Sequence, residues 1–213
     1  MQIKKLNIVF PTSYFPPIEY FYQLYKYPIG TIDIFENYIK QSYRNRCIIF
    51  SANGKLPLSI PVIKTTGNHT KVKDIKIDYQ QSWQRMHSRS IESAYNSSPF
   101  YLYYKDHLEH FFEKKHKFLI DLNFEILQVL FKLTKIHCEV KFSENYFEPD
   151  DKIIDFRKNI TPKIKQENSA VFPEYTQVFS DKHGFISNLS ILDLLFNEGK
   201  FTADYIKKIK PAL

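Results

Sequence analysis

Residues 6–26, LNIVFPTSYFPPIEYFYQLYK, decide the class of fold that the sequence predicts. The apolar run Leu6–Phe10 predicts a strand, which ends at Pro11 because proline cannot donate to a strand ladder. The later prolines of this segment fit a helix only at its start. Apolar residues then recur every three or four positions before Pro28, which is the period of an amphipathic helix. Thr31–Phe35 predicts a second strand, so strand and helix alternate as they do in α/β proteins.

The next segment has the pattern of a β-hairpin. Its arms are Cys47–Ala52 and Leu56–Ile63, and Asn53-Gly54 between them suits a type I′ turn, which needs positive φ angles. Prolines in the second arm assign that arm to the edge of a sheet. Val72–Asp78 alternates polar and apolar residues, which predicts a further strand with one face in water.

Helical periodicity dominates the middle of the chain. Residues 82–117 predict helix with a break at Ser97-Ser98-Pro99, and residues 119–133 carry the clearest apolar helical stripe. Cys138–Phe142 predicts one more strand. Together these elements predict an α/β fold, in which a mixed sheet has flanking helices and one β-hairpin accompanies it.

The C-terminal part is less regular. Residues 145–181 show little periodicity, and we interpret them as an irregular segment that lies over the surface. Ser190 has the spacing of a helix cap and Gly199 that of a helix stop, while Thr202 can cap a last short helix. The sequence therefore predicts a single domain over residues 1–213, with a C-terminal extension that ends in short helices.

The composition excludes several classes of protein. The chain has 213 residues, of which 43% are hydrophobic, and a chain of this size buries a core without needing disulfides or metal. Its two cysteines are too few for a zinc site or a disulfide framework. No apolar run approaches the ~18 residues of a membrane span. The first residues lack a signal-peptide region, so we expect a soluble, cytoplasmic protein.

The formal net charge of +7 raises the question of a nucleic-acid partner. However, only five of the thirty basic residues are arginines, and the abundance of lysine, asparagine, isoleucine, phenylalanine and tyrosine is typical of an AT-rich genome. We therefore rank nucleic acid last among the candidate partners. The same bias gives more weight to the few arginines and to the one tryptophan.

The first candidate site is the segment between the second strand and the hairpin. In an extended chain Arg44 and Arg46 point the same way, and two guanidinium groups can bind a phosphate or carboxylate bidentately. The alternative is a solvated loop whose arginines pair with nearby acids. The predicted substrate-binding residues of this segment are Asn37, Gln41, Arg44, Asn45 and Arg46.

The second candidate site is a helical stripe in which Trp83, His87, Ile91 and Tyr95 recur every four residues. If the stripe lines a pocket, His87 is the general base, because the pKa of histidine is near working pH. Trp83 and Tyr95 then contact the substrate. The alternative is a stripe of core residues in which His87 is hydrogen-bonded to a neighbour.

The loop after the first strand is the third candidate, because ligands of open α/β sheets bind beyond the carboxyl ends of the strands. Tyr14 is its predicted substrate contact, and the alternative is a proline-stiffened connection with buried aromatic side chains. The sequence contains no Walker loop, no G-x-G-x-x-G and no G-x-S-x-G. We predict no metal and no cofactor.

These pieces together resemble the WbqC-like family of bacterial proteins, in forms closest to those of the Bacteroidetes lineage. The resemblance spans nearly the whole chain, but residues 16–19 depart from the enterobacterial forms, in which a tryptophan and a glycine are usual. The segments that carry it are Pro11–Pro17, Glu19–Phe21, Gln41–Arg46, Ala52–Gly54, Leu58–Val62, Ile75–Asp78, the Trp83/His87/Ile91/Tyr95 stripe and Asn188–Leu195.

The resemblance implies a place among proteins encoded with O-antigen and surface-polysaccharide genes. It also implies group transfer, such as the attachment of an amino acid like glycine to a sugar. The first hypothesis is thus a transferase acting on a nucleotide- or lipid-linked sugar, with Arg44, Asn45, Arg46 and His87 in one site. The second is a non-catalytic module that binds an anionic ligand or a partner, and the third is a nucleic-acid binder.

Overall fold

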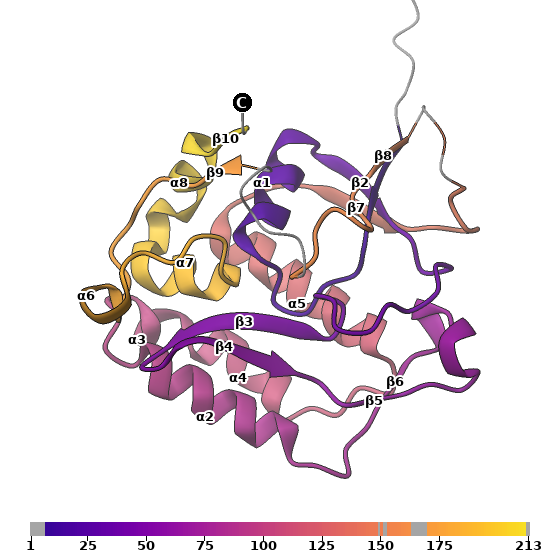
Figure 1. The fold of residues 1–213 in the computed structure, drawn as a ribbon, viewed down its shortest axis with the longest axis horizontal. Coiled ribbons are helices and arrows are strands. Elements are labelled where there is room, and N and C mark those ends of the chain that lie inside the picture. The colour runs from indigo at the N-terminus through magenta and orange to yellow at the C-terminus, as the bar shows by residue number, and fades with distance from the viewer. Residues whose placement is uncertain (1–6, 149, 151–152, 163–169, 212–213) are drawn as a thin grey trace, which may run out of the picture.

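The computed structural model describes residues 7–148, 150, 153–162 and 170–211 (Figure 1). Its fold class is the predicted one, because a sheet with flanking helices is joined by an antiparallel hairpin and by C-terminal helices. The strands are β1 (Asn7–Phe10), β2 (Ile29–Ile32), β3 (Arg46–Ser51), β4 (Gly54–Ser59), β5 (Val62–Ile63), β6 (Lys76–Ile77), β7 (Glu139–Phe142), β8 (Ile153–Asp155), β9 (Ala170–Val171) and β10 (Lys210–Pro211). The helices are α1 (Ile18–Lys26), α2 (Trp83–Tyr95), α3 (Tyr101–Tyr104), α4 (Asp106–Glu109), α5 (Leu119–Thr134), α6 (Ser180–His183), α7 (Ile191–Glu198) and α8 (Thr202–Lys208).

The central sheet has four parallel strands in the order β7-β2-β1-β8. The chain goes from β1 through α1 to β2 on one side of β1, and it later returns to place β8 on the other side. In the register, Thr31 of β2 lies between Val9 of β1 and Lys141 of β7. The carboxyl ends of all four strands therefore meet at one edge of the sheet.

One face of this sheet carries the aromatic core. Phe10 and Phe142 lie on that face because they pair with the same residue of β2. The Phe10 ring is 5.3 Å from that of Tyr20 in α1, and the Phe142 ring is 4.7 Å from that of Phe124 in α5. A side chain at Gly30 would come within 2.8 Å of the Phe10 ring, so the close packing of β2 requires glycine there.

The second strand is displaced from its predicted position. We expected residues 31–35, whereas β2 begins at Ile29 and ends at Ile32. The reason is local, because the Asp33 carboxylate accepts a hydrogen bond of 2.9 Å from the backbone N–H of Phe35. An aspartate that bonds the backbone two residues later turns the chain.

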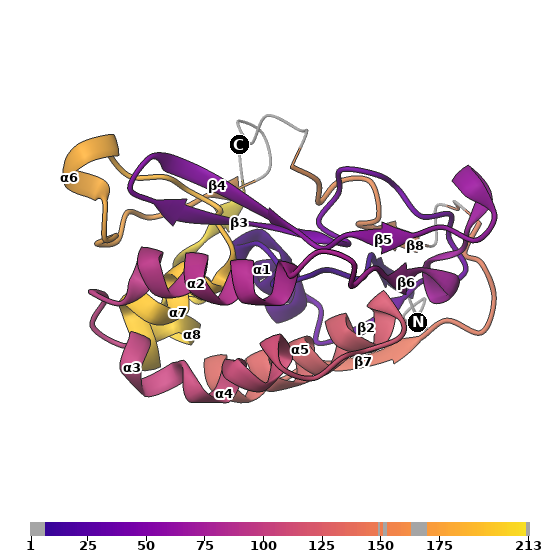
Figure 2. The same ribbon diagram turned by 90° about the horizontal axis from the view of Figure 1, so that it is seen from below.

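The hairpin forms as β3 and β4, but its turn differs from the predicted type I′ turn. Ser51 pairs with Gly54, so Ala52 and Asn53 are the turn residues, and only Gly54 has a positive φ, of 91°. The predicted second arm also divides, since β4 ends at Ser59 and β5 pairs with β6 instead. Figures 1 and 2 show this hairpin running alongside α2.

Two further expectations change in the structure. Residues 72–78, predicted as a strand, form a short 3₁₀ turn at Val72–Asp74 and then the two-residue β6. Residues 145–181, predicted to be irregular, include β8, which pairs with β1 in the central sheet. A strand of three residues is too short to show a period-two pattern, so β8 could not be predicted from periodicity.

The C-terminal helices form where the sequence predicts them, but only one of the two predicted caps is present. The Ser190 hydroxyl accepts a hydrogen bond from the N–H of Leu192 at the start of α7. Thr202 begins α8, but its hydroxyl donates to the carbonyl of Gly199 instead of capping the helix. Among the described residues, no helix combines the length and the apolar character that a membrane crossing needs.

Candidate anion-binding site

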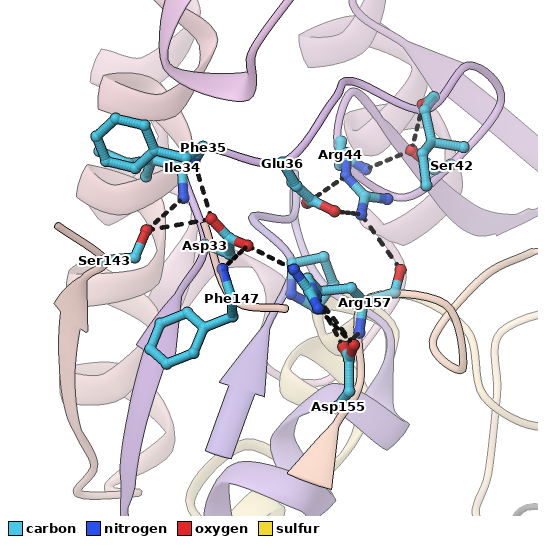
Figure 3. Close-up of polar contacts among 12 residues, drawn as sticks. Asp33, Ile34, Phe35, Glu36, Ser42, Arg44, Ser143, Phe147, Asp155 and Arg157 are labelled. Carbon is cyan, nitrogen blue, oxygen red and sulfur yellow. Dashed lines mark hydrogen bonds and ion pairs between the residues drawn. The ribbon is translucent and has the colours of Figure 1, made fainter. Parts of the chain in front are cut away.

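Charged side chains gather at the carboxyl edge of the central sheet (Figure 3). Asp33 directly follows β2, Ser143 directly follows β7, and Asp155 is the last residue of β8. Arg157 comes two residues after β8. Because the strands are parallel, these side chains reach the same place from three separate parts of the sequence. The position is the one at which open α/β sheets bind their ligands.

Asp33 is the centre of this group and has no exposed surface. One carboxylate oxygen accepts hydrogen bonds from the Phe35 N–H and, at 3.2 Å, from the Ser143 hydroxyl. The other accepts from the N–H of Phe147, at 3.3 Å, and from the Arg157 guanidinium, at 2.5 Å. A single buried carboxylate therefore fixes both an arginine and the loop of residues 143–147.

Arg157 is held from a second side by Asp155. The Asp155 carboxylate accepts from Nε and Nη2 of Arg157, with a shortest distance of 2.7 Å, and from the Arg157 backbone N–H. Burial alone would raise the pKa of Asp155, but the hydrogen bonds and charge of Arg157 outweigh it and lower the pKa. The Arg157 guanidinium also lies 5.0 Å from the centre of the Tyr146 ring. Its planar group is therefore fixed in one orientation.

Arg44 and Glu36 form the third ion pair of the group, and both are buried. Nε and Nη2 of Arg44 donate to the two carboxylate oxygens at 2.8 and 2.6 Å, which is a bidentate arrangement. Nη2 also donates to the backbone carbonyl of Arg157, which connects this pair to those of Arg157. Burial raises the pKa of Glu36 despite the opposing charge and hydrogen bonds of Arg44.

A pocket of about 330 Å³ opens beside these pairs, and we call it the anion pocket. Its volume lies within the range of ~300–1,000 Å³ that is usual for ligand sites. Glu36 and Asp155 are already paired with arginines, and Lys71 and Lys158 form no ion pair with any described residue, so the positive charge at the rim comes from these two lysines. The lining residues are Glu36, Asn37, Ile39, Lys71, Tyr146, Asp155, Arg157 and Lys158.

The predicted loop residues are distributed differently from our expectation. Asn37 lines the anion pocket, while Gln41 is exposed and is not among the lining residues. The alternative of a solvated loop with arginines paired to acids fits the others only in part, because Arg44 does pair with an acid but is buried, and Arg46 pairs with a hydroxyl. Arg44 binds Glu36 behind the pocket, Arg46 donates to the Ser59 hydroxyl at 2.8 Å, and the Asn45 amide donates to the Ile60 carbonyl at 2.7 Å.

The stripe on α2 lies in the core. Trp83, His87, Ile91 and Tyr95 are each at most 4% exposed. Nδ1 of His87 is 2.9 Å from the hydroxyl oxygen of Tyr14, and Tyr95 donates to Asp193 and accepts from the N–H of Phe50. Burial lowers the pKa of His87 to about 4, against a weaker opposing hydrogen bond with the Ser59 backbone. A catalytic role for His87 stays a prediction, and its surroundings are those of a core histidine.

The buried loop after β1 contacts both the α2 stripe and the segment that contains Arg44. Tyr14, which is 1% exposed, bonds His87 with its hydroxyl and the carbonyl of Tyr43 with its backbone N–H. The Asn123 amide of α5 donates to the Thr12 hydroxyl and to the carbonyl of Arg44. The loop after β1 therefore contacts both predicted clusters, but neither Arg44 nor His87 lines the anion pocket.

Sequence reasoning did not identify several residues of the pocket, namely Lys71, Tyr146, Asp155, Arg157 and Lys158. A signal was present, because Arg157 is one of only five arginines and follows Asp155 by two positions. It was overlooked because β8 was not predicted. Within the described residues, no group of three or more histidine, cysteine, aspartate or glutamate side chains is placed to hold a metal ion.

Comparisons with known proteins bear on this arrangement. A curated relative, named "Uncharacterized protein Rv1507c", of Mycobacterium tuberculosis, is 25% identical over 197 residues, which cover 80% of this chain and 84% of the relative. No solved structure matches the chain. The model of the WbqC-like protein family matches residues 12–171, which include the loop after β1, the hairpin, α2, α5 and every residue that lines the anion pocket. The chain therefore belongs to the WbqC-like protein family.

Proposed function

We propose that this protein is a group transferase that binds the phosphate of a nucleotide- or lipid-linked sugar in the anion pocket. One observation carries the proposal, namely that Lys71 and Lys158 flank an arginine fixed by two carboxylates at the carboxyl edge of a parallel sheet. A role in O-antigen or surface-polysaccharide synthesis belongs to the same proposal, and it rests on the resemblance described above.

Two features of the pocket favour anion binding, namely the positive charge at its rim and the hydrogen-bonded side chains beneath it. Asp33 and Asp155 neutralise much of the Arg157 charge, so the attraction for an anion comes mainly from the two lysines at the rim. Asn37 adds an amide that can donate to phosphate oxygens. Because the residues beneath the pocket are already hydrogen-bonded, little conformational entropy is lost when a ligand enters.

Glu36 is the group that we propose for proton transfer. It lines the pocket, and burial raises its pKa, which brings the carboxyl group closer to the pH at which it can exchange a proton with a substrate. In Glu36→Gln we expect phosphate binding to persist while turnover falls at least about a hundredfold. If turnover is also unchanged in Glu36→Gln, Glu36 is not the group that transfers the proton.

The binding proposal is tested by isothermal titration with inorganic pyrophosphate, the group that nucleotide- and lipid-linked sugars share. Lys158→Ala should weaken binding about tenfold, which corresponds to ~1.4 kcal/mol. The matched control is Lys208→Ala, because Lys208 is an exposed lysine on α8 outside the pocket lining. If wild type does not bind pyrophosphate, or if both variants weaken it equally, the anion pocket is not the binding site.

The transfer proposal needs a separate assay. Wild type and Glu36→Gln are incubated with nucleotide sugars and aminoacyl donors, and mass spectrometry then detects a modified sugar. A product that forms with wild type and not with the variant supports a transferase. Pyrophosphate binding without any product supports the binding module.

A further inference from the structure

A second pocket, of about 350 Å³, adjoins the anion pocket. Tyr146 lines both pockets, and its ring is close to the cations of the first one, at 5.0 Å from the Arg157 guanidinium and 5.9 Å from the Lys71 ammonium. The described residues that line the second pocket include no arginine. Its polar members include Asn7, Thr31, Ser143 and Asn145, together with one lysine and one glutamate.

The floor of the second pocket is a face of the central sheet. Thr31 and Lys141 pair across β2 and β7, and Thr31 also pairs with Val9, so all three lie on the face opposite Phe10. Asn7 lies on the same face because it precedes Val9 by two positions. Strands of parallel sheets are usually apolar on both faces, since both are covered by helices. Here Asn7 and Lys141 are exposed, so this face is open, and its polar side chains line a hollow that a ligand can enter.

The two pockets are fixed relative to each other by one residue. Asp33 holds Arg157 of the anion pocket and also bonds the Ser143 hydroxyl and the Phe147 N–H, on both sides of Tyr146. Figure 3 shows these contacts meeting at the same carboxylate. The wall that the pockets share therefore has a defined position before any ligand binds.

We infer that the two pockets bind the two parts of one ligand, a sugar phosphate. The phosphate lies between Lys71, Arg157 and Lys158, and the sugar ring lies in the second pocket against Tyr146. Amide and hydroxyl groups suit an uncharged ring with many hydroxyls, because each can donate or accept. The charges of Lys141 and Glu144 oppose each other there, which favours a neutral group over a second phosphate. This inference rests on the proposed function and adds the position of the sugar.

The test compares inorganic phosphate with a panel of hexose 1-phosphates by isothermal titration. Wild type should bind at least one hexose phosphate about tenfold more tightly than phosphate, because the second pocket adds hydrogen bonds to the sugar hydroxyls. Thr31→Val and Asn7→Ala should each remove most of that gain and leave the affinity for phosphate unchanged. Lys158→Ala should weaken both ligands by the same factor.

Two kinds of failure are distinguishable. If phosphate binds and Lys158→Ala weakens it, but no hexose adds affinity or the gain survives in both second-pocket variants, the sugar position is overturned and the phosphate site remains. If neither phosphate nor hexose phosphates bind wild type, the proposed function is overturned as well. Asn7 is exposed, so Asn7→Ala keeps the test decisive even if Thr31→Val fails to fold.

Discussion

The loop of Arg44 and Arg46 and the α2 stripe were predicted as parts of one site, yet the anion pocket beside that loop and the stripe lie in opposite environments. The pocket has two lysines at its rim and a network of ion pairs beneath it. The stripe is closed, and the imidazole of His87 is 2% exposed between Tyr14 and Trp83. Both regions contain buried polar groups, but only the first presents charge to an open hollow.

The difference shows which sequence pattern carries functional information. A spacing of four residues places side chains on one face of a helix, and that face can line a pocket or pack in a core equally well. Polar residues that directly follow parallel strands must gather at one edge of the sheet, where a ligand has access. Asp33 directly follows β2 and Asp155 is the last residue of β8, so both lie at that edge, whereas His87 has only the helical spacing.

The largest expected effect tests the buried network. In Asp33→Ala the Arg157 guanidinium loses a buried partner, and the 143–147 loop loses two hydrogen bonds. Breaking a buried pair on one side costs about 3–5 kcal/mol of unfolding free energy, which urea denaturation measures. The control is Asp204→Ala, which removes a surface pair with Lys207 and should cause no measurable change. If Asp33→Ala and Asp204→Ala lose the same unfolding free energy, the buried network stabilises the fold no more than a surface ion pair does.

The second effect tests whether His87 belongs to the core. Its folded pKa of about 4 is below the unfolded value of ~6.5, so the unfolded chain takes up the proton first as the pH falls. The contribution to stability is complete above pH ~6.5 and is lost towards pH 4, with about 2 kcal/mol lost by pH 5. Urea unfolding of wild type and of His87→Gln, each measured above pH ~6.5 and at pH ~5, isolates this loss. Equal losses in the two proteins would indicate an accessible, ordinary imidazole.

A third, smaller effect tests the rim of the anion pocket. Lys71→Ala should weaken pyrophosphate binding up to about tenfold, because one unpaired positive charge is removed. Lys73→Ala is the matched control, since the Lys73 ammonium lies 4.2 Å over the Phe35 ring and does not line the pocket. If Lys73→Ala loses more pyrophosphate affinity than Lys71→Ala, the binding surface lies around Lys73 and not in the anion pocket.

The smallest effect concerns the second arginine of the predicted pair. Arg46 is partly exposed and bonds the Ser59 hydroxyl, so Arg46→Ala should cost ~1 kcal/mol of stability or less. It should also leave pyrophosphate affinity unchanged. A tenfold loss of affinity, measured by titration, would restore the prediction that Arg44 and Arg46 bind the ligand together.

The sequence by itself determined the class of fold and the positions of α1, α5 and α7. These elements have local causes, namely helical spacing, prolines at the helix boundaries and a serine cap. It also singled out Asn37, which lines the anion pocket, and Tyr14, which follows β1. Such features depend on residues a few positions apart, and a single sequence displays them directly.

Only the tertiary structure decided the site itself. The ion pair of Arg157 and Asp33 joins residues 124 positions apart, and β8 reaches β1 across most of the chain. No local pattern encodes such a pairing, because a three-residue strand is too short to show a period and a charge does not indicate its partner. Tertiary packing also buried the α2 stripe, since the hairpin and the loop after β1 cover the face that the sequence had left open to two interpretations.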